Sequence, residues 1–202
     1  MANNAETFMR AGKKEIPVYL FTGFLDAGKT KFIQETLEDE RFNNGENTLL
    51  LICEEGEEEY DPSTFSGPNV FIELIDDQSE LTPSNLERLQ KKHAAERVVV
   101  EYNGMWMLDD LYQNMPESWM VYQEFMFADS QTFLMYDANM RGLVVDKLKS
   151  CEMVVLNRAD QADPAASKVW GAYFRSQGIS VLECDARTGA GVKQFSPIMR
   201  EA

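Results

Sequence analysis

The chain has 202 residues, 44% of them hydrophobic, which is enough for the core of one globular domain. It carries 34 acidic and 19 basic side chains, and the resulting net charge of −15 argues against a general role in binding nucleic acids or anionic lipid surfaces. No apolar run approaches the roughly 18 residues of a membrane span, and three widely spaced cysteines favour a reduced, cytoplasmic protein.

The first 15 residues are polar and lack the apolar core of a signal peptide, so they are expected to form a leader before a single domain of residues 16–202. Strand and helix patterns then alternate, which predicts an α/β fold with a mostly parallel sheet and helices on both faces. The expected strands are residues 18–21, 47–53, 70–75, 97–101, 132–136, 153–156 and 179–184. The expected helices are residues 29–37, 83–93, 140–149 and 164–177.

Two stretches between these elements lack such a pattern. Residues 54–68 are strongly acidic and contain glycine, so they are expected to form an exposed loop. Residues 105–129 contain two tryptophans and several methionines. Their aromatic side chains are expected to fill the core or an interface.

The first expected strand leads into a glycine-containing loop. Residues 23–30 read GFLDAGKT and fit the phosphate-loop pattern G-x-x-x-x-G-K-[ST] at every fixed position. In this motif backbone N–H groups surround the phosphates, Lys29 reaches the β- and γ-phosphates, and the Thr30 hydroxyl ligates Mg²⁺. The residues expected to contact the nucleotide here are Gly23, Asp26, Ala27, Gly28, Lys29, Thr30 and Lys31.

A second motif concerns the base. Residues 157–160 read NRAD directly after an apolar strand, where G proteins carry Asn-Lys-x-Asp. Asp160 is expected to accept hydrogen bonds from guanine, Asn157 to brace the loop, and Arg158 to stack on the base. The alternative is an Asx turn that caps the next helix. Asp185, after the last strand, is expected near the base, with a simple turn as an equal alternative.

The fourth expected strand ends on an acid, Glu101. An acid at this place holds the Mg²⁺ shell, so Glu101 joins Lys29 and Thr30 as the residues expected to act in catalysis. Gly104 follows closely, and its N–H is a candidate donor to the γ-phosphate. The competing acids, at the end of another expected strand, are Asp76 and Asp77.

Three groups of residues together resemble the CobW-type GTPase family, which is related to HypB and UreG. PVYLFTGFLDAGKT (17–30) resembles the family's P-V-x-x-x-T-G-F-L-G-A-G-K-T, and CEEGEEEYD (53–61) aligns with its N-E-F-G-E-x-x-x-D. VEYNG, YDAN and LNRAD resemble its E-x-S-G, D-A and N-K-x-D blocks in the same order. The resemblance covers roughly residues 16–195.

This resemblance implies a P-loop NTPase G domain that hydrolyses GTP to GDP with Mg²⁺ and serves metal insertion or cofactor maturation. Turnover is expected to be slow, because no catalytic Gln or Arg can be assigned. Glu54, Glu57 and Asp61 would lie in a nucleotide-responsive switch. The expected partners are a guanine nucleotide and an unidentified protein, with a nucleotide-dependent homodimer as one assembly to consider. The alternatives are a GTP/GDP sensor that does not hydrolyse and an ATP-using P-loop enzyme.

The chain also departs from the family pattern. Asp26 replaces a glycine of the loop and adds negative charge near the phosphates, and Lys31, in place of a usual threonine, is expected to offset it. The family's Cys-x-Cys-Cys metal motif is missing, because residues 74–80 read LIDDQSE.

Few soft metal ligands remain elsewhere in the chain. Cys53 and Cys184 both end apolar strands and are expected to be able to approach one another, but two thiols do not complete a closed site. The lone His93 is expected on the solvated surface of a polar helix. We therefore predict no tight zinc site in the isolated monomer.

Overall fold

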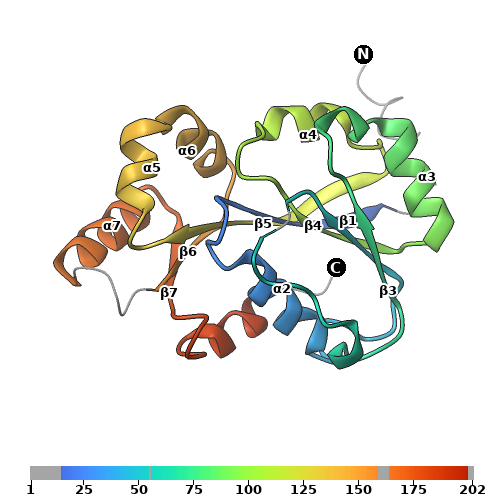
Figure 1. Ribbon diagram of the computed structural model, residues 1–202, viewed down its shortest axis with the longest axis horizontal. Coiled ribbons are helices and arrows are strands. Elements are labelled where there is room, and N and C mark those ends of the chain that lie inside the picture. Colours follow the sequence, from blue (N-terminus) through green and yellow to red (C-terminus); the bar gives the residue numbers. More distant parts are fainter. Residues whose placement is uncertain (1–14, 55, 159–163, 200–202) are drawn as a thin grey trace, which may run out of the picture.

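The computed structural model, which describes residues 15–54, 56–158 and 164–199, contains a seven-stranded, all-parallel sheet (Figure 1). The strands lie in the order β3-β2-β4-β1-β5-β6-β7. Their bounds are β1 Ile16–Gly23, β2 Thr48–Ile52, β3 Val70–Leu74, β4 Arg97–Glu101, β5 Trp119–Asp129, β6 Met153–Asn157 and β7 Ser180–Glu183. The fold is therefore the α/β arrangement of P-loop NTPases.

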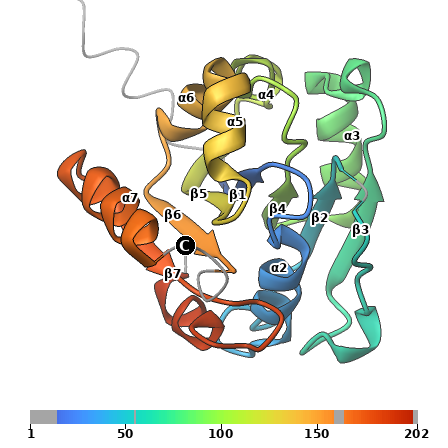
Figure 2. The same ribbon diagram turned by 60° about the vertical axis from the view of Figure 1, so that its left-hand side comes forward.

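Helices cover both faces of this sheet (Figures 1 and 2). Their bounds are α2 Lys29–Glu38, α3 Pro83–His93, α4 Leu108–Asn114, α5 Phe133–Asn139, α6 Arg141–Leu148 and α7 Pro164–Ser176. Helices α3 to α7 pack on one face, whereas α2 and the short 3₁₀ turns of residues 192–198 pack on the other. Within the described ranges, no helix is long and apolar enough to cross a membrane.

Strand β1 lies at the centre of the sheet, between β4 and β5. Its side chains alternate between the two faces: Val18 and Leu20 pack with α3 and α4, while Tyr19 and Phe21 pack with α2. All four are fully buried, as expected for a strand covered on both sides. The loop that follows β1 is thereby held by the most constrained part of the sheet.

One expected strand is wrong. Residues 132–136 do not form a strand but begin helix α5, and the fifth strand is β5, which lies in the stretch that gave no clear pattern. Strand β5 is hard to recognise because the polar residues Gln123 and Glu124 interrupt its apolar sequence. Both are buried: Gln123 Nε2 donates to the Ile198 carbonyl at 3.2 Å, and Glu124 accepts from the Tyr112 hydroxyl.

The expected approach of Cys53 to Cys184 is also wrong. Cys53 follows β2 and Cys184 follows β7, and four strands lie between these two in the sheet. At about 4.8 Å per strand spacing the two strands are roughly 24 Å apart. The two thiols also belong to core clusters on opposite faces of the sheet.

The expectation for helix α3 is half correct. Its start is confirmed, because the Asn85 N–H donates to the Thr82 hydroxyl at 3.3 Å. Its last residue, His93, is not solvated surface. The imidazole is mostly buried, stacks on Phe71 and places Nε2 2.6 Å from Glu73 Oε1.

Candidate active site

The carboxyl ends of parallel strands meet at one edge of the sheet, where α/β proteins bind ligands. The loop from β1 to α2 lies there. Gly23 and Gly28 have φ values of 131° and 96°, which favour glycine. A Cβ atom at Gly23 would lie 2.1 Å from the Phe127 carbonyl oxygen, and one at Gly28 would lie 2.4 Å from Asn157 Nδ2. The loop therefore needs glycine at both of the glycine positions of the phosphate-loop pattern.

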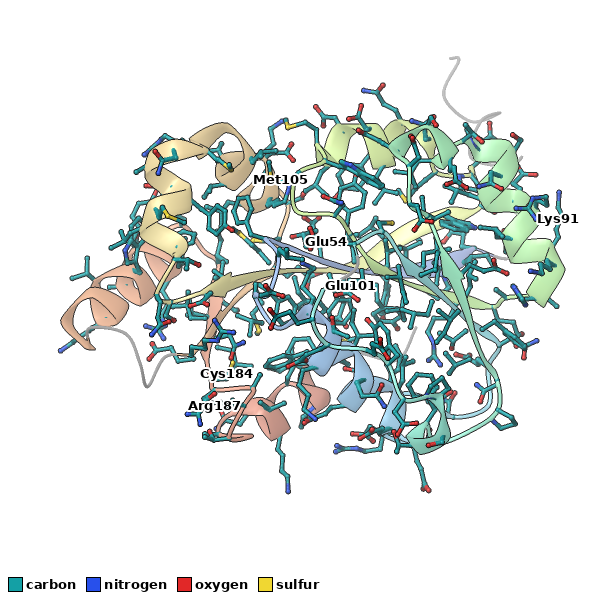
Figure 3. All side chains as sticks on the ribbon, in the orientation of Figure 1. Glu54, Lys91, Glu101, Met105, Cys184 and Arg187 are labelled. Atoms are coloured by element: carbon teal, nitrogen blue, oxygen red, sulfur yellow. The ribbon has the colours of Figure 1, made fainter. Side chains whose placement is uncertain are left out.

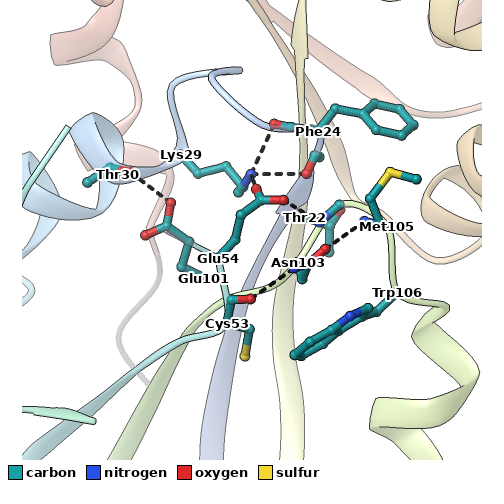
Figure 4. A network of polar contacts seen from close by, with 12 residues as sticks. Thr22, Phe24, Lys29, Thr30, Cys53, Glu54, Glu101, Asn103, Met105 and Trp106 are labelled. Atoms are coloured by element: carbon teal, nitrogen blue, oxygen red, sulfur yellow. Dashed lines mark hydrogen bonds and ion pairs between the residues drawn. The ribbon is translucent and has the colours of Figure 1, made fainter. Parts of the chain in front are cut away.

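Lys29 lies across this loop and is 3% exposed. Its Nζ donates to the carbonyl oxygens of Gly23 and Phe24, both at 3.0 Å, and contacts Glu54 Oε2 at 2.5 Å (Figure 4). The second carboxylate oxygen of Glu54 accepts from the Gly104 N–H at 3.1 Å. Glu54 thus bridges Lys29 and Gly104, the two groups expected to hold the γ-phosphate.

Glu101, at the end of β4, lies beside the start of α2. Its Oε1 accepts from the Thr30 hydroxyl at 2.8 Å, and its Oε2 accepts from the Tyr60 hydroxyl at 2.5 Å. Burial raises the pKa of Glu101, although the hydrogen bonds from Tyr60 and Thr30 and the charge of Lys29 act in the opposite direction. A hydroxyl and a carboxylate so close together form the hard oxygen donor set that suits Mg²⁺.

The competing acids lie elsewhere. Asp77 is exposed and caps the turn of residues 78–80 by accepting from the Ser79 N–H at 2.8 Å. Asp76 lines a different cavity, described below. The geometry therefore favours Glu101 over both as the acid beside Thr30.

Asn157 ends β6 and connects two loops. Its Nδ2 donates to the Ala27 carbonyl at 3.1 Å, and its Oδ1 accepts from the Ala186 N–H at 2.8 Å. The next residue, Arg158, places Nη1 2.5 Å from Asp129 Oδ2 at the end of β5. Asp160 lies outside the described residues, so its contact with a base stays a prediction.

Asp185 and Lys31 both contact residues that are close to them in the sequence. The Asp185 carboxylate is 2% exposed and accepts from the Thr188 hydroxyl at 2.7 Å and the Arg187 N–H at 3.0 Å, so it closes its own turn. These are the contacts of the turn alternative, and a contact of Asp185 with the base stays a prediction. Lys31 Nζ lies 3.4 Å from Glu35 Oε1 one helical turn away.

A cavity of about 180 Å³ lies beside the phosphate loop, and Glu54, Glu101 and Asn157 also line it. Among the described residues, its lining brings five carboxylates together with three cationic side chains. The carboxylates are those of Asp26, Glu54, Glu57, Glu58 and Glu101, and the cations are Lys29, Arg158 and Arg187. Such an excess of negative charge opposes a bare polyphosphate and favours one that arrives with a divalent cation.

A family model described as CobW/HypB/UreG, nucleotide-binding domain, matches residues 17–177. The chain belongs to this family. Over 49 residues it is 41% identical to Ribosome biogenesis GTPase A of Priestia megaterium, a match that covers 24% of this chain and 17% of that protein. The chain thus spans under a fifth of this curated relative.

Two solved structures share the fold of this CobW/HypB/UreG domain. Hydrogenase maturation factor HypB from Archaeoglobus fulgidus superposes with a TM-score of 0.60 at 16% identity, covering 92% of this chain and 88% of HypB. Zn(II)-bound YjiA GTPase from E. coli superposes with a TM-score of 0.54 at 19% identity, covering 85% and 57%. At these identities the likeness concerns the fold alone.

The departure at Asp26 has a backbone consequence in this CobW/HypB/UreG domain. Asp26 has a φ of 56°, the left-handed region where glycine is at no disadvantage. The side chain is exposed, lines the cavity and points its Oδ1 toward Gly56 of the acidic segment. Lys31 forms its ion pair with Glu35, so it does not offset this charge by direct contact.

A second cavity, of about 680 Å³, lies beside the first and shares Leu25 and Glu54 with it. It is lined by Phe24, Leu25, Cys53, Glu54, Asp76, Asn103, Met105, Trp106, Tyr136 and Met140. Burial raises the pKa of the Cys53 thiol, with Glu101 and Glu54 adding to the shift. Among the described residues, His, Cys, Asp and Glu side chains form no group of three that could hold a metal ion. The absence of a tight zinc site stays a prediction.

Sequence reasoning missed two residues of the site. Tyr60 gave no signal within the acidic segment, because its contact with Glu101 depends on how that segment folds back over β4. Sequence reasoning misses Asp129 because it predicts the fifth strand at residues 132–136, and the resemblance places the family's D-A block at residues 136–139. Asp137 of that block lies on helix α5 and pairs with Arg141 at 3.5 Å.

Proposed function

We propose that this domain binds GTP with Mg²⁺ and hydrolyses it to GDP and phosphate. The observation that carries the proposal is the meeting of Lys29, Thr30 and Glu101 at one cavity, with Asn157 bracing the same loop. These groups come from three strand ends that are far apart in the sequence. Their convergence supports one function for all of them.

Each group has a task in this proposal. The N–H groups of the loop and the ammonium of Lys29 stabilise negative charge on the transferred phosphoryl group. Thr30 and Glu101 hold Mg²⁺, which neutralises charge on the phosphate oxygens. In the described part of the chain no glutamine lines the cavity, which supports slow turnover.

Base choice rests on Asp160 and on the loop that Asn157 braces. Asp160 accepts hydrogen bonds from guanine donors that adenine lacks, so GTP is preferred over ATP by at least about tenfold. Calorimetry with both nucleotides tests this. Asp160→Ala should remove the preference, and equal affinity of the wild type for ATP would favour the ATP-using alternative.

Turnover separates an enzyme from a sensor. We expect steady-state phosphate release with GTP and Mg²⁺, and its loss in Lys29→Ala together with nucleotide binding. Because Lys29 is buried and pairs with Glu54, this variant also loses about 1–3 kcal/mol of stability, so its folding is checked by urea denaturation. Tight GTP binding without turnover would establish the non-hydrolysing sensor.

A role in handling metals or metal cofactors, in the cytoplasm and with a protein partner, is the wider part of the proposal. It is supported by the family match and by relatives of the same fold, one called a hydrogenase maturation factor and one solved with Zn(II). A nucleotide-dependent homodimer is the assembly to test first, by light scattering with GDP and with a GTP analogue.

A further inference from the structure

We propose that Glu54 occupies the γ-phosphate position and thereby sets the preference of this domain between GDP and GTP. The inference rests on the proposed function and adds a specificity-determining residue to it. The resemblance to the CobW-type family implies that Glu54 lies in a nucleotide-responsive switch, but it does not predict which residues Glu54 contacts. The structure supplies two contacts, one for each oxygen of the carboxylate (Figure 4). Figure 3 shows Glu54 and Glu101 near the centre of the view.

The two contacts are those that a terminal phosphate would need. Lys29 Nζ lies 2.5 Å from Oε2, and the Gly104 N–H lies 3.1 Å from Oε1. The ion pair is shielded from water, with the Lys29 side chain 3% exposed and the Glu54 side chain 10% exposed. A charge-assisted contact in such a place is stronger than one on the surface.

The backbone holds Glu54 in position for this contact. The preceding residue, Cys53, donates its N–H to the Glu101 carbonyl at 2.8 Å and accepts from Asn103 Nδ2 at 3.1 Å. The segment that contains Glu54 is thus fixed to the end of β4 on one side and to the Gly104 loop on the other. Glu54 needs no rearrangement of the sheet to reach Lys29.

The same acidic segment is held at a second place. Tyr60 contacts Glu101, and the Gln34 side chain bonds both the N–H and the carbonyl oxygen of Asp61, each at 3.1 Å. The segment is therefore held at Cys53 and again at Tyr60 and Asp61. Glu54 lies next to the first of these attachments, and its displacement leaves the Gln34 attachment available.

The two nucleotides differ at this position. GTP brings a γ-phosphate that needs Lys29 and Gly104 and repels the Glu54 carboxylate, so Glu54 has to leave. GDP has no group there, so the contact between Glu54 and Gly104 can remain. Glu54 therefore weakens the binding of GTP more than the binding of GDP.

Two variants and one control separate this effect from general repulsion among acids. Glu54→Gln removes the charge at nearly constant size. Glu54→Asp keeps the charge but withdraws the carboxylate by one methylene, so that it no longer spans both donors. Glu58→Gln removes a charge that lines the same cavity, from an exposed side chain of the same segment.

The experiment measures calorimetric affinities for GDP and for a non-hydrolysable GTP analogue, with Mg²⁺ present. We expect Glu54→Gln to raise the affinity for the GTP analogue about tenfold or more, with a much smaller change for GDP. Glu54→Asp should shift the ratio in the same direction, whereas Glu58→Gln should change this ratio much less than Glu54→Gln does. An unchanged ratio in both Glu54 variants would overturn the inference.

A second readout follows the contact itself. The Gly104 amide resonance of the wild type should keep its position with GDP and move with the GTP analogue. A resonance that moves equally with both nucleotides would count against the inference. If neither the wild type nor Glu54→Gln binds any guanine nucleotide, the proposed function fails and this inference with it. Binding with an unchanged ratio removes this inference alone.

Discussion

Asp26 is an acid in the one loop of the molecule that is expected to bind phosphate. Its backbone is left-handed, with a φ of 56°, and its carboxylate adds to four others around the cavity. The charge opposes nucleotide binding, whereas the left-handed backbone is a conformation that aspartate tolerates. The position therefore offers a direct way to strengthen binding by a single substitution.

We predict that Asp26→Gly raises the affinity for GTP by a few-fold to about tenfold, because it removes a like charge. Asp26→Asn removes the same charge while keeping a residue that tolerates this φ, so it should raise the affinity by a similar factor. Calorimetry on both variants measures the two affinities. If neither variant binds GTP more tightly than the wild type, the Asp26 charge has no influence on the phosphates.

Helix α6 holds the loop that leads from β4 to α4. Asp146 accepts from the Leu108 N–H at 2.9 Å, and Lys147 Nζ donates to the Trp106 carbonyl at 3.0 Å. Lys147 is completely buried, and burial lowers its pKa to about 8. Nearby charges have smaller effects on this pKa: Asp146, Glu54 and Glu124 raise it, and Lys29 lowers it.

This pKa gives a pH dependence with a definite sign. Because the folded state binds the Lys147 proton more weakly than the unfolded chain does, its contribution to stability is greatest above pH 10.5 and is lost as the pH falls through 8. Between pH 7 and 10 the free energy of unfolding of the wild type should rise by about 2–3 kcal/mol relative to that of Lys147→Met.

The comparison with Lys147→Met is necessary because the buried cysteines titrate in the unfolded chain over the same pH range. Urea denaturation at each pH gives the two free energies. Lys149→Met, which removes an exposed lysine just beyond the same helix, is the control and should track the wild type. A constant difference between the wild type and Lys147→Met would show that Lys147 keeps an ordinary pKa.

At the scale of secondary-structure elements, the sequence predicts best those strands whose apolar residues follow one another without interruption. The sequence predicts strand β4 with the correct bounds because Val98 to Val100 form one uninterrupted apolar run between two charged residues. Strand β5 was missed because the reason for burying Gln123 and Glu124 lies in residues distant in the sequence. The motif residues of the site were found by spacing, whereas the Glu54 and Tyr60 contacts depend on which strand ends are neighbours.

At the scale of the molecule, burial limits the reactivity of the three thiols, and the strand order limits which of them can pair. Cys53, Cys151 and Cys184 are all buried, and burial raises the pKa of each. The thiolate is the reactive form, so all three are protected. Strand order also keeps Cys53 and Cys184 apart.

We therefore predict that the native protein reacts with much less than one equivalent of a thiol reagent within minutes, and with three equivalents in guanidinium chloride. Mass spectrometry of the oxidised native protein should find no disulfide between Cys53 and Cys184. Rapid labelling of one thiol in the native state would mean that its part of the core opens readily.

The central position of β1 also matters while the chain is being made. Parallel neighbours cannot be joined by a tight turn, and both partners of β1 lie later in the sequence, with β5 ending at Asp129. The roughly 100 residues between Gly23 and Asp129 take on the order of 5–20 s to synthesise at about 5–20 residues per second. Until the end of that interval, the strand that will carry the phosphate loop lacks at least one of its two neighbours, because β4 is complete at Glu101 and β5 only at Asp129.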